Sequence, residues 1–258
     1  SDIDVKTIAR GTPGFAGADL ANLVNEGAIM AARSNQKMVT MKNLEDAKDK
    51  IMMGTERRSI IMQKSEKELT AYHEAGHALV ASCLPDADPV HKISIIARGH
   101  AGGYTLKLPF DERRLMSRQS FLDDIAMSLG GYVAEKEIFG DITTGPSNDL
   151  QVATNMARAM VTKYGMSTLG PIALEKDNEV KYFYGNSYSE AFGEKIDDEV
   201  KRIMDEAWQR ARKIIIDRRD ALNAIAEELI KVENIEREEF EKLLIANGIK
   251  PKEKEELE

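Results

Sequence analysis

The residues that decide the fold are SEKELTAYHEAGHALVAS, at positions 65–82. Ser65 followed three residues later by Glu68 is typical of a capping box, and Pro85 follows the run, so the sequence predicts one helix here. Inside this helix, His73 and His77 are four residues apart, which places both imidazoles on one face, about one turn from each other. Two histidines in that arrangement are able to bind one metal ion.

Glu74 lies between these histidines in the pattern His-Glu-x-x-His. In a chain with four histidines, the chance of meeting this pattern at random is on the order of one in a hundred. Because Glu74 follows His73 directly, its carboxylate projects beside the metal and is able to take a proton from a water molecule without being a ligand. The sequence therefore indicates a general base. The competing interpretation is a partly exposed helix with two surface histidines.

The third metal ligand is not in this helix. A catalytic zinc normally has three protein ligands and one open position. His91 and His100 flank the expected strands and are candidates, whereas Cys83 is expected to be a small buried residue facing the core. Asp149 is the best-placed carboxylate, because a loop leads there into the first turn of a helix. The helix dipole alone also explains an aspartate in that turn, so the residues by themselves leave the third ligand open.

The segments around this helix predict a mainly α fold with a small β-sheet (α+β). Two β-rich runs at 92–96 and 104–108, separated by glycines, predict an antiparallel pair, and we expect no other sheet. The edge of that pair is able to accept an extended peptide as an added strand. Helical periodicity predicts helices at 117–139, 148–164 and 194–246, the last one interrupted near Asp217 and Glu233. Segment 183–192, rich in Gly, Asn and Ser, is expected to be a mobile connection.

The long helical stretch from Glu194 onward carries more apolar positions than a small domain with one metal site is expected to need. Contacts between subunits would use such a surplus, whereas burial within one chain is the plainer explanation.

The first fifty or so residues predict a separate helical subdomain. Turn chemistry at 11–14 separates a short helix from a second one, and Thr40 is the expected N-cap of a third. The expected apolar faces comprise Leu20, Leu23, Val24, Ala28 and Ala31 in the second helix, and Met41, Leu44, Ala47 and Ile51 in the third. A polar, charged stretch between Gly54 and Glu68 indicates a boundary, which divides the chain into residues 1–54 and 55–258.

Composition limits the classes of partner. The chain has 258 residues and a net charge of −8, which disfavours nucleic acid and anionic membranes as partners. Its apolar stretches fall far short of the roughly 20 residues that span a bilayer, and a single cysteine, which excludes an internal disulfide, indicates a reducing compartment. Because the chain starts at Ser1 without a Met, we expect a soluble piece of a longer protein, from which a membrane segment could have been removed.

Four segments, in order and spanning essentially the whole chain, resemble the FtsH family of membrane-anchored AAA zinc metalloproteases. They are TPGFAGADLANL at 12–23, LTAYHEAGHA at 69–78, the stretch from GG at 130–131 to FG at 139–140, and SND at 147–149. The resemblance implies that residues 1–54 are the C-terminal part of the AAA helical lid and that residues 55–258 are the zinc peptidase domain.

The same resemblance implies roles for individual residues. His73, His77 and Asp149 would bind Zn²⁺, and Glu74 would be the general base. Glu135 also matches the family and is a candidate for orienting a ligand histidine, although a structural salt bridge explains it equally well.

At the level of function, the resemblance implies a zinc-dependent endopeptidase that hydrolyses unfolded or membrane-extracted proteins. It would be the proteolytic part of an ATP-dependent quality-control homo-hexamer on the cytoplasmic face of the bacterial inner membrane, or in an organelle equivalent. The phosphate-binding motif G-x-x-x-x-G-K-[ST] is absent, so ATP and Mg²⁺ would belong to the full-length protein only.

Two other interpretations compete with this one. The first is a catalytically inactive helical assembly or adaptor module, against which the intact histidine pair and Glu74 argue. The second is a different zinc hydrolase such as a deformylase, against which the AAA-like helices argue.

Overall fold

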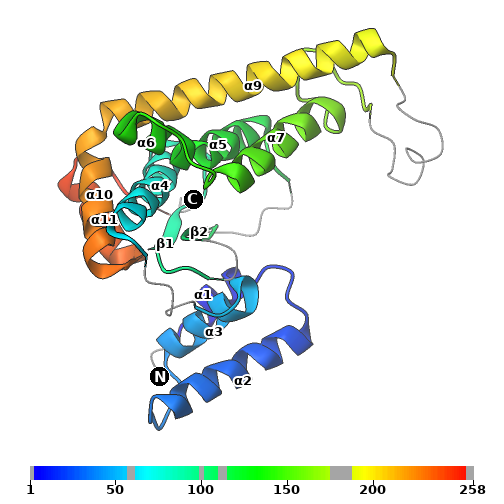
Figure 1. Cartoon of the computed structure of the whole chain (residues 1–258). Coiled ribbons are helices and arrows are strands. Elements are labelled where there is room, and N and C mark those ends of the chain that lie inside the picture. Colours follow the sequence, from blue (N-terminus) through cyan, green and yellow to red (C-terminus); the bar gives the residue numbers. More distant parts are fainter. Residues whose placement is uncertain (1–2, 57–61, 99–101, 110–114, 175–187, 254–258) are drawn as a thin grey trace.

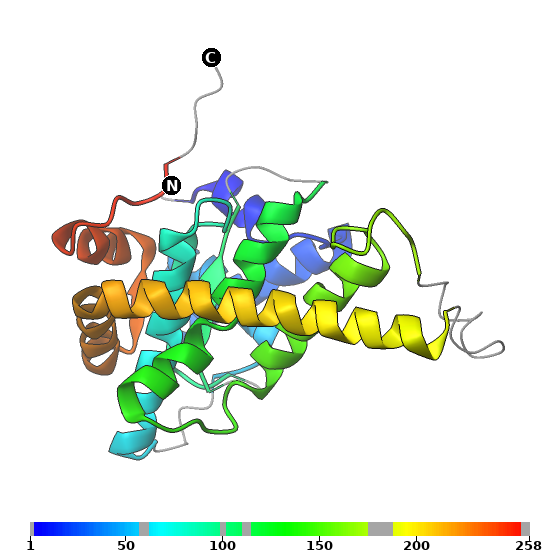
Figure 2. The ribbon, with the colours of Figure 1, turned by 90° about the horizontal axis from the view of Figure 1, so that it is seen from above.

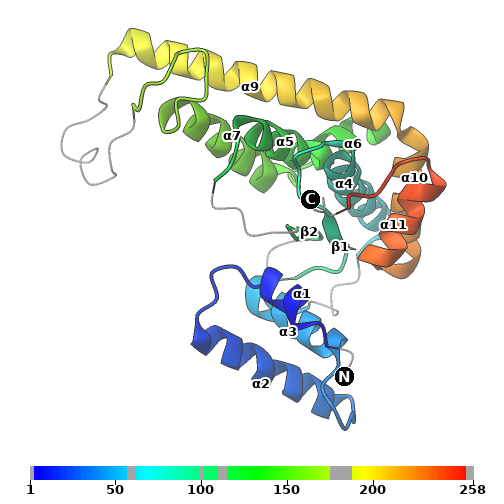
Figure 3. The ribbon, with the colours of Figure 1, turned by 180° about the vertical axis from the view of Figure 1, so that it is seen from behind.

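A computed structural model describes residues 3–56, 62–98, 102–109, 115–174 and 188–253. The helices of the N-terminal residues lie on one side of a small sheet, and most of the remaining helices lie on its other side (Figure 1). The same arrangement is visible from behind in Figure 3. None of the helices in the described ranges is long and apolar enough to cross a membrane.

Helix α4, Lys64–Cys83, is the centre of the larger helical group. Nearly every residue from Ala71 to Ala81 is buried, so α4 is enclosed on all sides rather than along one stripe. It contacts α5 (Arg118–Ser128), α6 (Gly130–Phe139), α9 (Glu190–Asp217) and α10 (Arg219–Val232). The predicted helix is confirmed. The predicted capping box is wrong, because α4 begins one residue earlier, with Gln63 as an N-cap that makes no side-chain hydrogen bond.

Helices α4 and α6 approach each other through glycines. A Cβ atom at Gly76 would lie only 2.4 Å from the carbonyl oxygen of Gly130, and one at Gly130 would lie 2.7 Å from the carbonyl oxygen of Gly76. This contact is therefore made between two backbones. The single helix predicted at 117–139 is wrong in that α5 ends at Ser128 and α6 starts at Gly130, with Leu129 as the one interrupting residue, directly before the glycine that contacts α4.

The sheet has three antiparallel strands in the order β2-β1-β3. Strand β1, Val90–Ser94, is central and packs on α4, and β2, Tyr104–Lys107, is an edge strand. The predicted antiparallel pair is confirmed. The described residues hold this one sheet, as expected, but the structure adds a third strand that was not predicted: β3, Asn234–Glu236, pairs with β1, and its three residues contain a single apolar side chain, which is too little for a period-2 signal.

Helix α9 is 28 residues long, or about 42 Å, and lies across α5, α6 and α7 (Ser147–Thr162) (Figure 2). The breaks predicted near Asp217 and Glu233 are confirmed, since α10 ends at Val232 and α11 spans Arg237–Ala246. Residues 183–187 of the predicted connection lie outside the described residues, and the prediction is wrong for residues 190–192, which belong to the first turn of α9.

Most of the apolar positions expected in α9 and α10 are buried within the chain, which supports the plainer of the two explanations given for them. Their buried apolar side chains include Ile196, Val200, Ile203, Leu222, Ile225 and Leu229.

The N-terminal helices are α1 (Val5–Arg10), α2 (Gly17–Arg33) and α3 (Met41–Met53). The predicted N-cap at Thr40 is confirmed, because its hydroxyl accepts the backbone N–H of Asn43. The predicted face of α2 is partly wrong. Leu23, Gly27 and Ala31 are buried, whereas Leu20, Val24 and Ala28 are exposed. The contact of α2 with α3 passes through Gly27, since a Cβ there would lie 2.8 Å from Leu44 of α3.

Candidate metal centre

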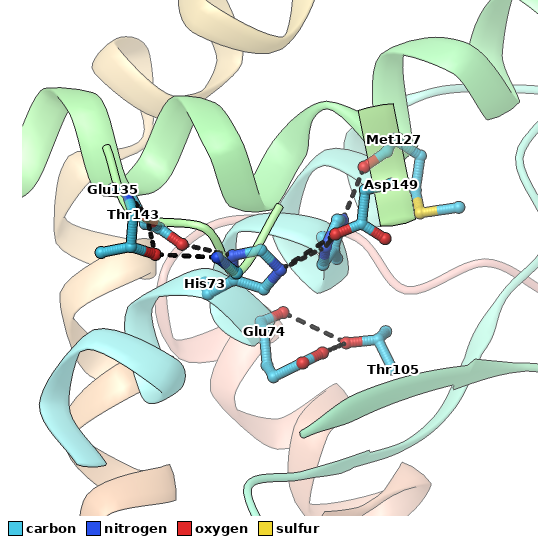
Figure 4. Close-up of polar contacts among 9 residues, drawn as sticks. His73, Glu74, Thr105, Met127, Glu135, Thr143 and Asp149 are labelled. Atoms are coloured by element: carbon cyan, nitrogen blue, oxygen red, sulfur yellow. Dashed lines mark hydrogen bonds and ion pairs between the residues drawn. The ribbon is translucent and has the colours of Figure 1, made fainter. Parts of the chain in front are cut away.

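Three predicted site residues come together where the first turn of α7 meets α4 (Figure 4). The Nε2 atoms of His73 and His77 are 3.0 Å apart. Oδ2 of Asp149 lies 3.2 Å from Nε2 of His73 and 3.5 Å from Nε2 of His77. Within the described ranges, this is the group of His, Cys, Asp or Glu side chains whose ligand atoms are close enough to hold one metal ion.

His91, another candidate for the third ligand, is not at this centre. His91 belongs to β1 and its Nε2 lies 3.2 Å from Oε1 of Glu45 in α3, on the side of the N-terminal helices. His100 lies outside the described residues. Cys83 is half-buried and packs against the core, as its predicted role requires.

The proton positions on both imidazoles follow from their outer hydrogen bonds. Nδ1 of His73 lies 2.8 Å from Oε1 of Glu135, and Nδ1 of His77 lies 2.8 Å from the backbone carbonyl oxygen of Met127. A carbonyl oxygen only accepts, and so does an ionised carboxylate. Burial raises the pKa of Glu135, but the hydrogen bonds from His73 and Thr143 outweigh it and lower that pKa below its usual value. Both Nδ1 atoms therefore carry the hydrogen, and both Nε2 atoms present lone pairs.

Two nitrogen lone pairs and a carboxylate oxygen thus face one another with no hydrogen between them, an arrangement that is repulsive without a cation. In the absence of a metal, a proton takes that place. Burial lowers the pKa of His73, but its hydrogen bonds to Asp149 and Glu135 raise it to about 10. Burial raises the pKa of Asp149, but the hydrogen bonds and charges of both imidazoles lower it by more, so this pKa ends well below its usual range. Two imidazoles and a carboxylate are the donor types that Zn²⁺ prefers, so these residues fit that ion.

Glu135 holds His73 in place. Its carboxylate is fully buried, and Oε2 accepts hydrogen bonds from the backbone N–H (3.0 Å) and hydroxyl (2.9 Å) of Thr143. A Cβ atom at Gly131 would lie 2.5 Å from Cε1 of His73, so the ring also rests on the α6 backbone. Of the two explanations left open for Glu135, this contact supports orientation of a histidine. Sequence reasoning missed Met127, Thr143 and Gly131; the glycine pair inside a helix was the one signal of close approach.

Glu74 lies below the His73 ring in Figure 4, turned toward β2. It is buried, and its Oε2 accepts a hydrogen bond of 2.8 Å from the hydroxyl of Thr105. Burial raises the pKa of Glu74, and the imidazoles of His73 and His77 and the Thr105 hydroxyl offset part of that rise. A carboxylate with a raised pKa is better matched to proton transfer near neutral pH than an exposed one.

Comparison with known proteins agrees with this arrangement. Residues 60–243 match the model of peptidase family M41, and residues 2–46 match the AAA+ lid domain. The ATP-dependent zinc metalloprotease FtsH of Caulobacter vibrioides is 48% identical over 264 residues, which cover 99% of this chain and 42% of that protein. The protein of the same name from Kosmotoga olearia is 50% identical over 251 residues, covering 94% of this chain and 39% of that protein. The chain therefore spans about two fifths of the length of these curated relatives.

Proposed function

The chain belongs to peptidase family M41, and from this premise we propose that it is a zinc-dependent endopeptidase with His73, His77 and Asp149 as metal ligands and Glu74 as general base. The observation that carries the proposal is the convergence of the two Nε2 atoms of His73 and His77 and one carboxylate oxygen of Asp149, within 3.5 Å of each other. An adaptor that had lost its activity would have no use for such an arrangement.

Zinc held by these three residues would be a Lewis acid, able to polarise a water molecule and the scissile carbonyl group. Glu74 accepts the proton of the attacking water at its carboxylate and then donates it to the amide nitrogen of the leaving chain. Glu135 and the carbonyl of Met127 hold the imidazoles in the tautomers that ligation requires. The burial of Glu74 keeps bulk water away from the proton it carries.

An extended polypeptide is the substrate that fits the sheet. Strand β2 lies at the edge of the order β2-β1-β3, and its Thr105 contacts Glu74. A peptide added along β2 would bind through main-chain hydrogen bonds, with little selectivity for side chains. We therefore propose unfolded or membrane-extracted proteins as substrates.

The full-length protein, by the same proposal, is an ATP-dependent quality-control protease. Residues 1–54 are assigned to the AAA lid and residues 55–258 to the peptidase domain, a division that the separate matches to residues 2–46 and 60–243 support. ATP and Mg²⁺ would bind in parts that this chain does not contain. The subunits would form a homo-hexamer on the cytoplasmic face of the bacterial inner membrane or its organelle equivalent, and neither nucleic acid nor a membrane would contact this part.

Zinc analysis combined with a casein-cleavage assay tests the proposal. The purified chain is expected to hold about one zinc ion and to cleave casein slowly. Glu74→Gln retains the shape of the side chain and removes the proton acceptor, so zinc content should persist while cleavage falls by at least about 100-fold. Glu66→Gln, an exposed position of the same helix, is the matched control and should behave like the parent chain. Loss of zinc in Glu74→Gln, or a zinc-loaded parent chain without activity, would overturn the assignment.

A further inference from the structure

We infer that Thr105 is a positioning residue for the general base, and that the N-terminal helices hold it in place through Tyr104. This inference rests on the proposed function of Glu74. It connects the hydrogen bond between Thr105 and Glu74 with a second hydrogen bond, between Tyr104 and Asp49, on the opposite face of β2.

The first observation is the way in which β2 encloses the Glu74 carboxylate. The Thr105 hydroxyl lies 2.8 Å from Oε2 of Glu74 and 3.3 Å from its backbone carbonyl oxygen. A hydroxyl has one hydrogen to donate, and the closer acceptor, the charged carboxylate oxygen Oε2, receives it. A Cβ atom at Gly103 would lie 2.8 Å from Oε1 of Glu74, so the backbone just before β2 rests against the second oxygen. Thr105 therefore fixes the torsion of the Glu74 carboxylate.

The second observation is what holds β2. Neighbouring residues of a strand point to opposite faces, so Tyr104 faces α3 while Thr105 faces α4. The Tyr104 hydroxyl donates a 2.9 Å hydrogen bond to Oδ2 of Asp49 in α3. Nζ of Lys92, on the same face of β1, lies 3.3 Å from the same oxygen. Asp49 is buried, so water does not compete strongly for this contact.

These contacts form one physical connection from α3 to the base. Strand β2 is paired on one side only, so its position depends on side-chain contacts more than that of a central strand does. Displacing Tyr104 displaces its neighbour Thr105, and with it the carboxylate of Glu74. The N-terminal helices thus help to set the geometry of the base, although they contribute no residue to the metal centre.

The test compares Thr105→Val with Thr105→Ser in the 258-residue chain. Valine keeps the shape and strand preference but has no hydroxyl, so kcat should fall about tenfold or more while KM and zinc content stay unchanged. Serine restores the donor and should recover most of kcat. Thr162→Val is the matched control, because Thr162 is buried and its hydroxyl donates a hydrogen bond within α7, to the carbonyl oxygen of Arg158. Parent kcat in Thr105→Val, or equal losses in the valine and serine variants, would overturn the inference.

Tyr104→Phe tests the connection to α3. It should lower kcat about threefold in the parent chain and have no further effect in the Thr105→Val background, because both changes act on the same hydrogen bond. If Tyr104→Phe and Thr105→Val lower kcat independently, so that their factors multiply in the double variant, this part of the inference is overturned.

A measurement that needs no activity separates this inference from the proposed function. Glu74→Met keeps the length of the side chain and removes both oxygens. If Thr105 and Glu74 interact as described, the fall in Tm of the double variant with Thr105→Val should be smaller than the sum of the single falls, by about 2–4 °C. Additive falls would overturn the inference even in an inactive protein. If the parent chain is inactive but the Tm values still show the interaction between Thr105 and Glu74, only the proposed function is overturned.

Discussion

Replacing Gly76 by alanine tests whether the contact between α4 and α6 sets the metal centre. The added Cβ would lie 2.4 Å from the carbonyl oxygen of Gly130, 2.9 Å from its carbonyl carbon and 2.7 Å from Cβ of Ala134. Two of these atoms belong to the backbone and cannot rotate away. The helices must therefore separate by about 0.6–1 Å before the contacts become ordinary.

The energy balance follows from two opposing effects. Alanine favours a helix interior over glycine by about 1 kcal/mol. Overpacking costs about 1–3 kcal/mol, and a clash with backbone belongs at the upper end of that range. The variant should therefore be less stable by about 2 kcal/mol, which lowers Tm by about 4–8 °C in a chain of this size.

The same displacement reaches the metal centre. Helix α6 carries Glu135, whose Oε1 lies 2.8 Å from Nδ1 of His73, and a shift approaching 1 Å breaks that bond. Loss of an outer hydrogen bond to a ligand histidine lowers metal affinity by about 10–100-fold. Misplacement of this size also lowers kcat by about 100-fold.

Thermal unfolding followed by circular dichroism, zinc affinity by chelator competition, and casein cleavage measure the three effects. Gly193→Ala in α9 is the matched control, because its Cβ would lie 3.5 Å from Cε2 of Tyr188, an ordinary contact. The control should be more stable by about 0.5–1 kcal/mol. Parent Tm and zinc affinity in Gly76→Ala would refute the backbone contact, and a lower Tm with unchanged zinc affinity would show that α6 does not set the centre.

Three other predictions concern the ligand, the metal-free state and the assembly. Asp149→Ala should lower zinc content well below one ion per chain, because two imidazoles alone hold zinc weakly, and full occupancy would exclude Asp149 as a ligand. In the metal-free chain, the pKa of His73 is about 10 when folded and 6.5 when unfolded, so its stabilising contribution is complete below pH 6.5 and lost as the pH rises to 10. Tm of the chelator-treated chain should fall across that window, and a rising Tm there would contradict the assignment. Light scattering from micromolar to high-micromolar concentrations should detect hexamers, whereas monomers throughout would place the assembly contacts in the missing segments.

Local sequence was sufficient for the helix that carries His73 and His77, because the geometry of a helix repeats. Once residues 65–82 are helical, the spacing of His73 and His77 places both rings on one face whatever surrounds them. Glu74 follows by adjacency. The breaks in the C-terminal helices and the N-cap at Thr40 were equally local, and the structure confirms them.

Features that depend on contact between distant segments were harder to predict from the sequence. The face of α2 was misjudged because Gly27, which carries no apolar side chain, marks the contact with Leu44. Strand β3 was missed because Ile235 is its single apolar residue, and β3 exists by pairing with β1. The carbonyl of Met127 has no sequence signature at all, since any residue would offer the same backbone oxygen to His77.

By itself the sequence determined the helical class, the histidine pair and the adjacent carboxylate, all of which depend on spacings of a few residues along one helix. Asp149 was one of several open candidates on the residues alone and was favoured by the resemblance, and the tertiary structure decided that its carboxylate, and not the ring of His91, lies within 3.5 Å of both Nε2 atoms. The tertiary structure also decided the tautomers of His73 and His77 and the hydrogen bond from Thr105 that positions Glu74. The physical reason is that such hydrogen bonds depend on how closely α6, α7 and β2 approach α4, and this approach is set by glycines and backbone atoms that carry little sequence signal.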